Sequence, residues 1–150
     1  MDSSFSPAVP YLSKVRSQKF PWVNLALFIA TCFSTLLMGT LLTMDFEGVP
    51  LSGFWQPANL LLGLPFSFAI MSILFAHEMG HYLTCRYYGI DASLPYFIPF
   101  PNPVGTMGAF IKIRAPIQNR GSLLEVGVAG PIAGFVVAVA ALALSMGHAR

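Results

Sequence analysis

Three long apolar segments, separated by polar or proline-rich stretches, dominate the chain. Residues 21–44 carry no charge and are mostly Leu, Phe, Ala and Thr. A second segment runs from Asn59 to about Gly89, and Pro65 either kinks it or marks its true start. The third covers residues 123–146 and is rich in Ala, Val and Gly. A spanning helix needs about 20 apolar residues. The pattern therefore predicts a membrane α-helical protein with about three transmembrane helices.

The stretch between the second and third segments, residues 90–120, follows a different pattern. Its prolines exclude a helix over most of its length. Residues 105–108 (GTMG) predict a turn, and residues 109–114 come to alternate apolar and polar side chains, as a strand does. Aromatic residues make this stretch too apolar for a loop in water. We expect a membrane-associated, β-like re-entrant loop, whose backbone must be satisfied by protein or by a wet cavity.

Composition supports a lipid environment. Hydrophobic residues make up 55% of the chain and charged residues 9%, and the mean hydropathy is +0.68. Soluble proteins carry about a quarter charged residues, so the lipid bilayer is the expected surrounding. The net charge of +2 is too small to indicate a nucleic-acid partner. The two cysteines, Cys32 and Cys85, have no disulfide or metal-ligand spacing and are expected to be packing residues.

The cations predict how the chain is oriented. One group precedes the first apolar segment, and another lies between residues 86 and 120, whereas the loop after the first segment has acids only. Under the positive-inside rule, the N-terminus and the 86–120 region lie in the cytoplasm, and the pattern suits a bacterial inner membrane. Residues 1–20 are interpreted as a cytoplasmic polar tail, and residues 21–150 as one membrane domain.

The second segment ends in a chemically specific motif. His77 and His81 lie four residues apart, so in a helix both imidazoles project from one face and can reach one Zn²⁺. Glu78 points to the neighbouring side, where it can act as the general base for a zinc-activated water. A carboxylate within an apolar helix is costly unless it has a partner or a function. The motif therefore predicts a metalloprotease.

The third zinc ligand is not evident from the residues. Asp91 and Glu125 are the acids that follow the motif. A turn or capping role is expected for Asp91, and Glu125 is expected to cap the third helix, although either could in principle bind the metal.

The combined motifs resemble the site-2 protease family of intramembrane zinc metalloproteases. The resemblance rests on FAHEMGH at residues 75–81 and AGP at residues 129–131. LPYFIP at residues 94–99 and GTMGAF at residues 105–110 are similar to a bacterial and chloroplast branch of that family. The match covers about residues 70–135.

This resemblance implies hydrolysis of peptide bonds in transmembrane protein substrates, with zinc held by His77 and His81 and with Glu78 as general base. A substrate must unwind before cleavage, and it could pair as a strand with the backbone edge near residues 108–113. The expected substrate-binding residues are Gly108, Ala109, Phe110 and Ile111.

The family's third ligand, an aspartate on a later helix, has no counterpart before Arg150. The sequence is therefore interpreted as the N-terminal fragment of such an enzyme or as a truncated reading frame, inactive as written because its site is incomplete. A non-proteolytic membrane binding protein derived from such a protease is the alternative. A small membrane scaffold with a fortuitous zinc motif is a third reading, which the AGP match opposes.

Overall fold

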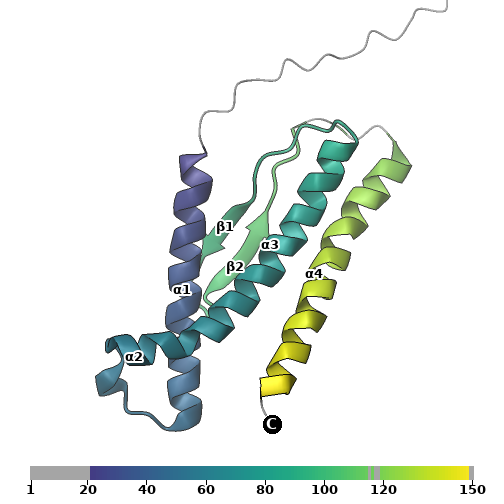
Figure 1. Cartoon of the computed structure of the whole chain (residues 1–150). Helices are drawn as coiled ribbons and strands as arrows, with labels where there is room; N and C mark the ends of the chain where they lie inside the picture. The colour runs from purple at the N-terminus through teal and green to yellow at the C-terminus, as the bar shows by residue number, and fades with distance from the viewer. Residues whose placement is uncertain (1–20, 115, 117–118, 149–150) are drawn as a thin grey trace, which may run out of the picture.

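The structure is a computed structural model that describes residues 21–148 except 115, 117 and 118. The predicted polar tail, residues 1–20, lies outside the described residues. Three long helices are present in the described part, namely α1 (Trp22–Glu47), α3 (Leu64–Tyr87) and α4 (Arg120–His148). In Figure 1, the start of α1, the end of α3 and the start of α4 lie at the same end of the molecule. Successive long helices therefore run in opposite directions, as three consecutive membrane spans must.

The described part of the chain contains three helical stretches long and apolar enough to cross a membrane, Trp22–Glu47, Pro57–Tyr87 and Arg120–Gly147. Their surfaces carry many exposed large apolar side chains, such as Phe33, Phe68 and Phe135. In water such surfaces would be unfavourable, whereas in a bilayer they face hydrocarbon. The chain is therefore a multi-pass membrane protein, and the predicted number of spans is confirmed.

The first helix is longer than its apolar pattern. The sequence assigned Asp45 and Glu47 to a polar loop, which was wrong, because α1 continues to Glu47. Gly48 ends it in the left-handed conformation (φ 68°), and the N–H groups of Gly48 and Val49 donate to carbonyls of the last turn. The end of α1 is therefore set by Gly48 and not by the end of the apolar segment. Two acids can lie in the last turn because a helix end remains accessible to water.

Short helical turns connect α1 to α3. They are a 3₁₀ turn at Leu51–Gly53, α2 (Pro57–Leu60) and a second 3₁₀ turn at Leu61–Gly63. Pro65 lies in the first turn of α3, where a missing N–H breaks no intrahelical hydrogen bond. Of the two predicted roles, Pro65 therefore marks the start of the long helix.

The proline-rich stretch forms an antiparallel hairpin of β1 (Tyr96–Pro99) and β2 (Thr106–Phe110). The predicted turn at 105–108 and strand at 109–114 were misplaced, because the strand begins at Thr106 and ends at Phe110. The Asn102 side chain explains the difference. Its oxygen accepts from the N–H groups of Val104 and Gly105, and its amide donates to the Thr106 carbonyl, which closes the turn earlier.

The hairpin lies between α1 and α3 (Figure 1) and is held along α1. The Asn24 side chain donates to the carbonyls of Leu94 and Pro95, at 3.0 and 2.8 Å. The rings of Phe28 and Phe97 pack edge to face with centroids 5.1 Å apart. Gly105, at the tip, lies so close to the α1 backbone that a side chain there would collide with it.

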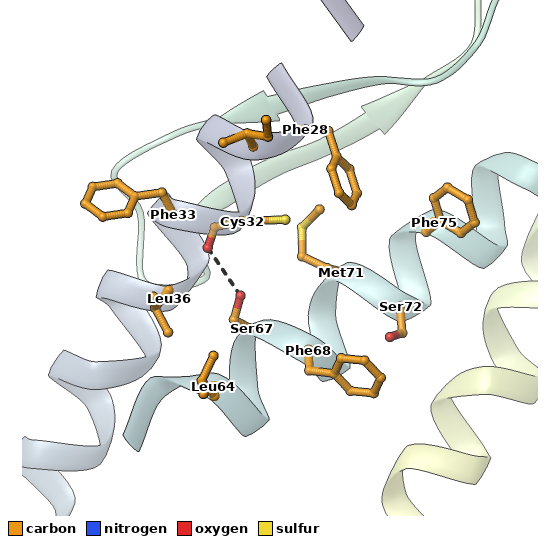
Figure 2. A pocket seen from close by; sticks show the side chains of 11 residues that line it. Phe28, Cys32, Phe33, Leu36, Leu64, Ser67, Phe68, Met71, Ser72 and Phe75 are labelled. Carbon is orange, nitrogen blue, oxygen red and sulfur yellow. Dashed lines mark hydrogen bonds between the residues drawn. The ribbon is translucent and has the colours of Figure 1, made fainter. Parts of the chain in front are cut away.

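The contact between α1 and α3 combines hydrogen bonds with an apolar groove. The hydroxyls of Thr35 and Ser67 are 2.7 Å apart, and Ser67 also donates to the Cys32 carbonyl. Figure 2 shows the groove beside this bond, lined by aromatic and aliphatic side chains that include Phe68 and Met71. Its volume is about 640 Å³. Cys32 also lines this groove.

Glycines bring α3 and α4 into close contact. A side chain on Gly80 would collide with the Ala129 backbone, and one on Gly134 would lie 3.2 Å from Cβ of His77. Gly130 and Gly134 both face α3, and small residues four apart let membrane helices approach each other closely. The packing places residues 126–134 of α4 directly beside residues 77–81 of α3.

Candidate metal centre

His77 and His81 project from α3 toward each other. Their Nε2 atoms are 3.2 Å apart, and their ring centroids are 4.9 Å apart. Two nitrogens bound to one tetrahedral zinc at about 2.0–2.1 Å are separated by about 3.3–3.4 Å. The two imidazoles are therefore spaced as ligands of one zinc ion.

The orientation of His81 is fixed by α4. Its Nδ1 lies 2.6 Å from the carbonyl oxygen of Val126. A carbonyl only accepts, so Nδ1–H is the donor, and in the neutral ring Nε2 keeps its lone pair for a metal. Zinc-binding histidines usually have such a hydrogen bond on the second ring nitrogen. Val126 was not singled out from the sequence, since a backbone carbonyl on a distant helix leaves no residue-type signal.

Glu78 lies beside the histidines on the neighbouring side of α3. Glu78 is only 5% exposed. Together with His81, it lines a cavity of about 350 Å³. The backbone of Ile111 interacts with its carboxylate. The helix thus places a mostly buried carboxylate next to the candidate zinc position, where a molecule that enters the cavity can contact it.

The cavity has three walls. Residues of α3 form one wall and the first turns of α4 form another. The remaining wall is the end of β2 and the residues that follow it, namely Ala109, Phe110, Ile111 and Ile113. Ala109, Phe110 and Ile111, three of the four predicted substrate-binding residues, line it. Gly108 does not line it and instead occupies a left-handed conformation (φ 104°) within β2, near the irregularity in strand pairing. Among the described strands, β2 pairs only with β1, so its other edge is unpaired.

The two acids considered as third ligands have other partners. Asp91 lies 3.7 Å from the Arg114 guanidinium, and its backbone carbonyl accepts from Arg114 N–H. Glu125 accepts a hydrogen bond from the Tyr88 hydroxyl, and this bond raises the pKa of Tyr88. Within the described residues, no three His, Cys, Asp or Glu side chains form a possible metal site. The described residues thus offer two candidate ligands, His77 and His81, where catalytic zinc typically has three protein ligands.

The expectation that Glu125 caps the third helix was wrong. The helix starts at Arg120, because the Asn119 side chain accepts from the N–H of Gly121 and its carbonyl accepts from Leu123. Glu125 therefore lies in the second turn, where it ties α4 to the end of α3 through Tyr88.

Sequence reasoning also missed Gly80, Gly127 and Leu123. Gly80 brings the α4 backbone against the zinc motif, and the other two line the cavity. A signal for Gly80 existed, because glycine inside a helix costs about 1 kcal/mol relative to alanine and needs a packing reason. Gly127 and Leu123 left no such signal, because α4 is apolar on all sides and its sequence does not show which face contacts α3.

Comparison with known proteins gives a consistent result. The family model for peptidase family M50 matches residues 65–149, more than half of the chain. Proteins named as probable zinc metalloprotease EGY2, chloroplastic, are 33% identical over 72% of this chain in Arabidopsis thaliana and 36% identical over 76% in Oryza sativa subsp. japonica. The Arabidopsis EGY1 protein, with the corresponding name, is 31% identical over 55% of this chain.

The matched regions are short relative to these proteins. They span 20% of the two EGY2 proteins and 15% of the EGY1 protein, so the chain spans about a fifth of the length of the curated relatives it matches. No solved structure matches the chain. The family match covers the zinc motif, the hairpin and α4 together, and the chain therefore belongs to peptidase family M50, the site-2 protease family of zinc metalloproteases.

Proposed function

We propose that this chain carries part of the active site of an intramembrane zinc metalloprotease, which hydrolyses peptide bonds in transmembrane protein substrates. The observation that carries the proposal is the 3.2 Å separation of the His77 and His81 Nε2 atoms beside the buried Glu78. Two imidazoles and a carboxylate together in an apolar helix are unfavourable without a function. Their arrangement matches what hydrolysis by zinc requires.

Each residue has a distinct role in this proposal. His77 and His81 bind zinc through Nε2, and the Val126 carbonyl keeps His81 in the required tautomer. Zinc, when bound, supplies Lewis-acid activation of water and of the scissile carbonyl. Glu78 takes the proton from the attacking water and transfers it to the leaving amine. The third ligand comes from a residue outside the described part of the chain.

The hairpin supplies the place for the substrate. It follows α1 from Asn24 to the Ser34–Thr35 backbone, which at 1.5 Å per residue is roughly 16 Å along a helix long enough to span the membrane. We infer from this length that the hairpin enters the membrane alongside α1, as the expected re-entrant element would. Its backbone is satisfied by the paired strands, by Asn24 and by Asn102.

A substrate segment unwound from its helix loses its internal hydrogen bonds. The unpaired edge of β2 and residues 109–111 can replace them, because an extended peptide adds to an exposed strand edge through backbone hydrogen bonds. A peptide on this edge would run along the cavity that contains Glu78 and His81. The hairpin would therefore hold the scissile bond next to the zinc.

The orientation is proposed from the cations. Arg86, Lys112 and Arg114 cluster at the end of the molecule where α3 ends, and the loop between α1 and α3 has none. We assign that end, together with the N-terminus, to the cytoplasmic side of a membrane such as the bacterial inner membrane.

The proposal is tested with the complete gene product in proteoliposomes that contain a transmembrane substrate. Wild-type protein should cleave it, a zinc chelator should stop cleavage and added zinc should restore it. Glu78→Gln should lower kcat by about a hundredfold or more while zinc stays bound, and Glu47→Gln, at the opposite end of the molecule, serves as the control. Substrate binding without cleavage by the zinc-loaded wild type would instead support the non-proteolytic binding protein.

A further inference from the structure

Gly127 differs from the other glycines on the inner face of α4. It lines the 350 Å³ cavity with Glu78 and His81, yet a Cβ atom built on it meets nothing within 4 Å. Gly130 and Gly134, by contrast, are in tight contact with the imidazoles of α3. Helix packing therefore requires glycine at 130 and leaves little room for a side chain at 134, but does not require glycine at 127.

Backbone conformation does not require glycine at this position either. Gly127 lies within α4, and the positive φ angles in the described residues belong to other glycines. Glycine inside a helix costs about 1 kcal/mol relative to alanine. The remaining physical consequence of its missing side chain is open space in the cavity wall.

The surroundings of that space define what it can accept. Phe110, Ile111 and Ile113 line the cavity on the hairpin side, and Leu123 lies one helical turn before Gly127 on α4. Glu78 is the acid among the lining residues, and its partner His81 is committed to Val126 on one ring nitrogen. Apart from these two, the lining side chains are apolar, so a bulky apolar group fits better than a polar one.

We propose that Gly127 is a specificity-determining residue, whose missing side chain makes room for a bulky apolar side chain of the substrate next to the scissile bond. The inference rests on the proposed proteolytic function and adds its substrate class. A peptide held along residues 109–111 places its side chains alternately on two faces, and one side chain of the face turned toward α4 would then lie at Gly127. Substrates with Leu or Phe at the corresponding position should be preferred over those with Gly or Ala.

The experiment uses the complete gene product and one transmembrane substrate with Ala, Leu or Phe at each position flanking the mapped cleavage site. Gly127→Ala and Gly127→Leu are compared with Gly147→Ala and Gly147→Leu. Gly147 is the matched control, because it lies on the same helix, has open space around it and does not line the cavity. Both series add the same side chains to α4, and only the Gly127 variants place them at the cavity.

Wild-type protein should cleave the Leu or Phe substrate faster than the Ala substrate. Gly127→Leu should lower kcat/KM for the bulky substrates by roughly tenfold or more and leave the Ala substrate much less affected, because one methylene in an apolar pocket already changes kcat/KM by about tenfold or more. Zinc content should not change. The wild-type order of preference in Gly127→Leu would overturn the inference while leaving the protease intact.

A binding readout separates the inference from the proposed function. In a Glu78→Gln background, a cysteine at the flanking substrate position should form a disulfide with Gly127→Cys under a mild oxidant, and not with Gly147→Cys. Absence of this disulfide with a substrate that wild-type protein cleaves would refute the assigned contact. No cleavage by the wild type of any substrate in the panel would refute the proposed function, and the inference with it.

Discussion

Gly130 lies against the His81 ring so closely that a methyl group on it would overlap the imidazole. The glycine is therefore part of the candidate zinc site, although it carries no ligand. Four residues earlier, the Val126 carbonyl receives the Nδ1 hydrogen of the same ring. One turn of α4 thus sets both the space available to His81 and its tautomer.

We predict that Gly130→Ala weakens zinc binding by about tenfold to a hundredfold, the usual cost of disturbing groups that orient a ligand. The added methyl must push the His81 ring away or separate the two helices. Zinc affinity of the complete gene product, measured by competition with a chromophoric chelator, gives the result. Gly147→Ala, on the same helix with open space around it, should bind zinc like the wild type, and equal affinities in both variants would contradict this account.

Proline at position 111 tests the strand edge. Ile111→Pro removes a backbone N–H beside the Glu78 carboxylate and at the cavity wall, so cleavage should be abolished while zinc stays bound. Ile111→Ala keeps the N–H and should retain most of the cleavage. Ala109→Pro, within β2, is expected to behave as Ile111→Pro does. Unchanged cleavage in both proline variants would refute pairing of the substrate with this edge.

The spans and the zinc motif could be predicted because each is a local pattern. Hydropathy over some 20 residues defines a spanning helix, and two histidines four residues apart must share a helix face. The boundaries that were misplaced depended on single polar groups instead. The Asn102 side chain moved the turn of the hairpin, and that of Asn119 moved the start of α4.

The cavity could not be predicted, because it depends on how three separate segments pack. AGP at 129–131 was recognisable as a motif, but its proximity to His81 is a property of the α3–α4 contact. Gly127 carries no chemistry of its own, so only its place in the cavity wall, together with the open space at its Cβ position, distinguishes it.

The hydroxyl contact between α1 and α3 should contribute to stability. Thr35→Val removes the 2.7 Å hydrogen bond to Ser67 in a buried position. We predict a loss of about 0.6 kcal/mol and at most roughly 1.7 kcal/mol in the free energy of unfolding, the range measured for such bonds between membrane helices. Reversible unfolding in mixed detergent micelles gives the value.

Thr43→Val is the matched control for this measurement. The Thr43 hydroxyl donates to the Gly39 carbonyl within its own helix, so its loss should leave the contact between α1 and α3 unchanged. An equal loss of stability in both variants would show that the Thr35–Ser67 bond contributes nothing specific.

The central claim is that His77 and His81 together hold zinc, and X-ray absorption at the zinc edge of the complete gene product tests it most directly. The account predicts one zinc per chain with two imidazole nitrogens at about 2.0–2.1 Å, and loss of that zinc in His77→Ala and in His81→Ala. Zinc that remains bound in both variants, or a zinc shell without imidazole nitrogens, would contradict the account.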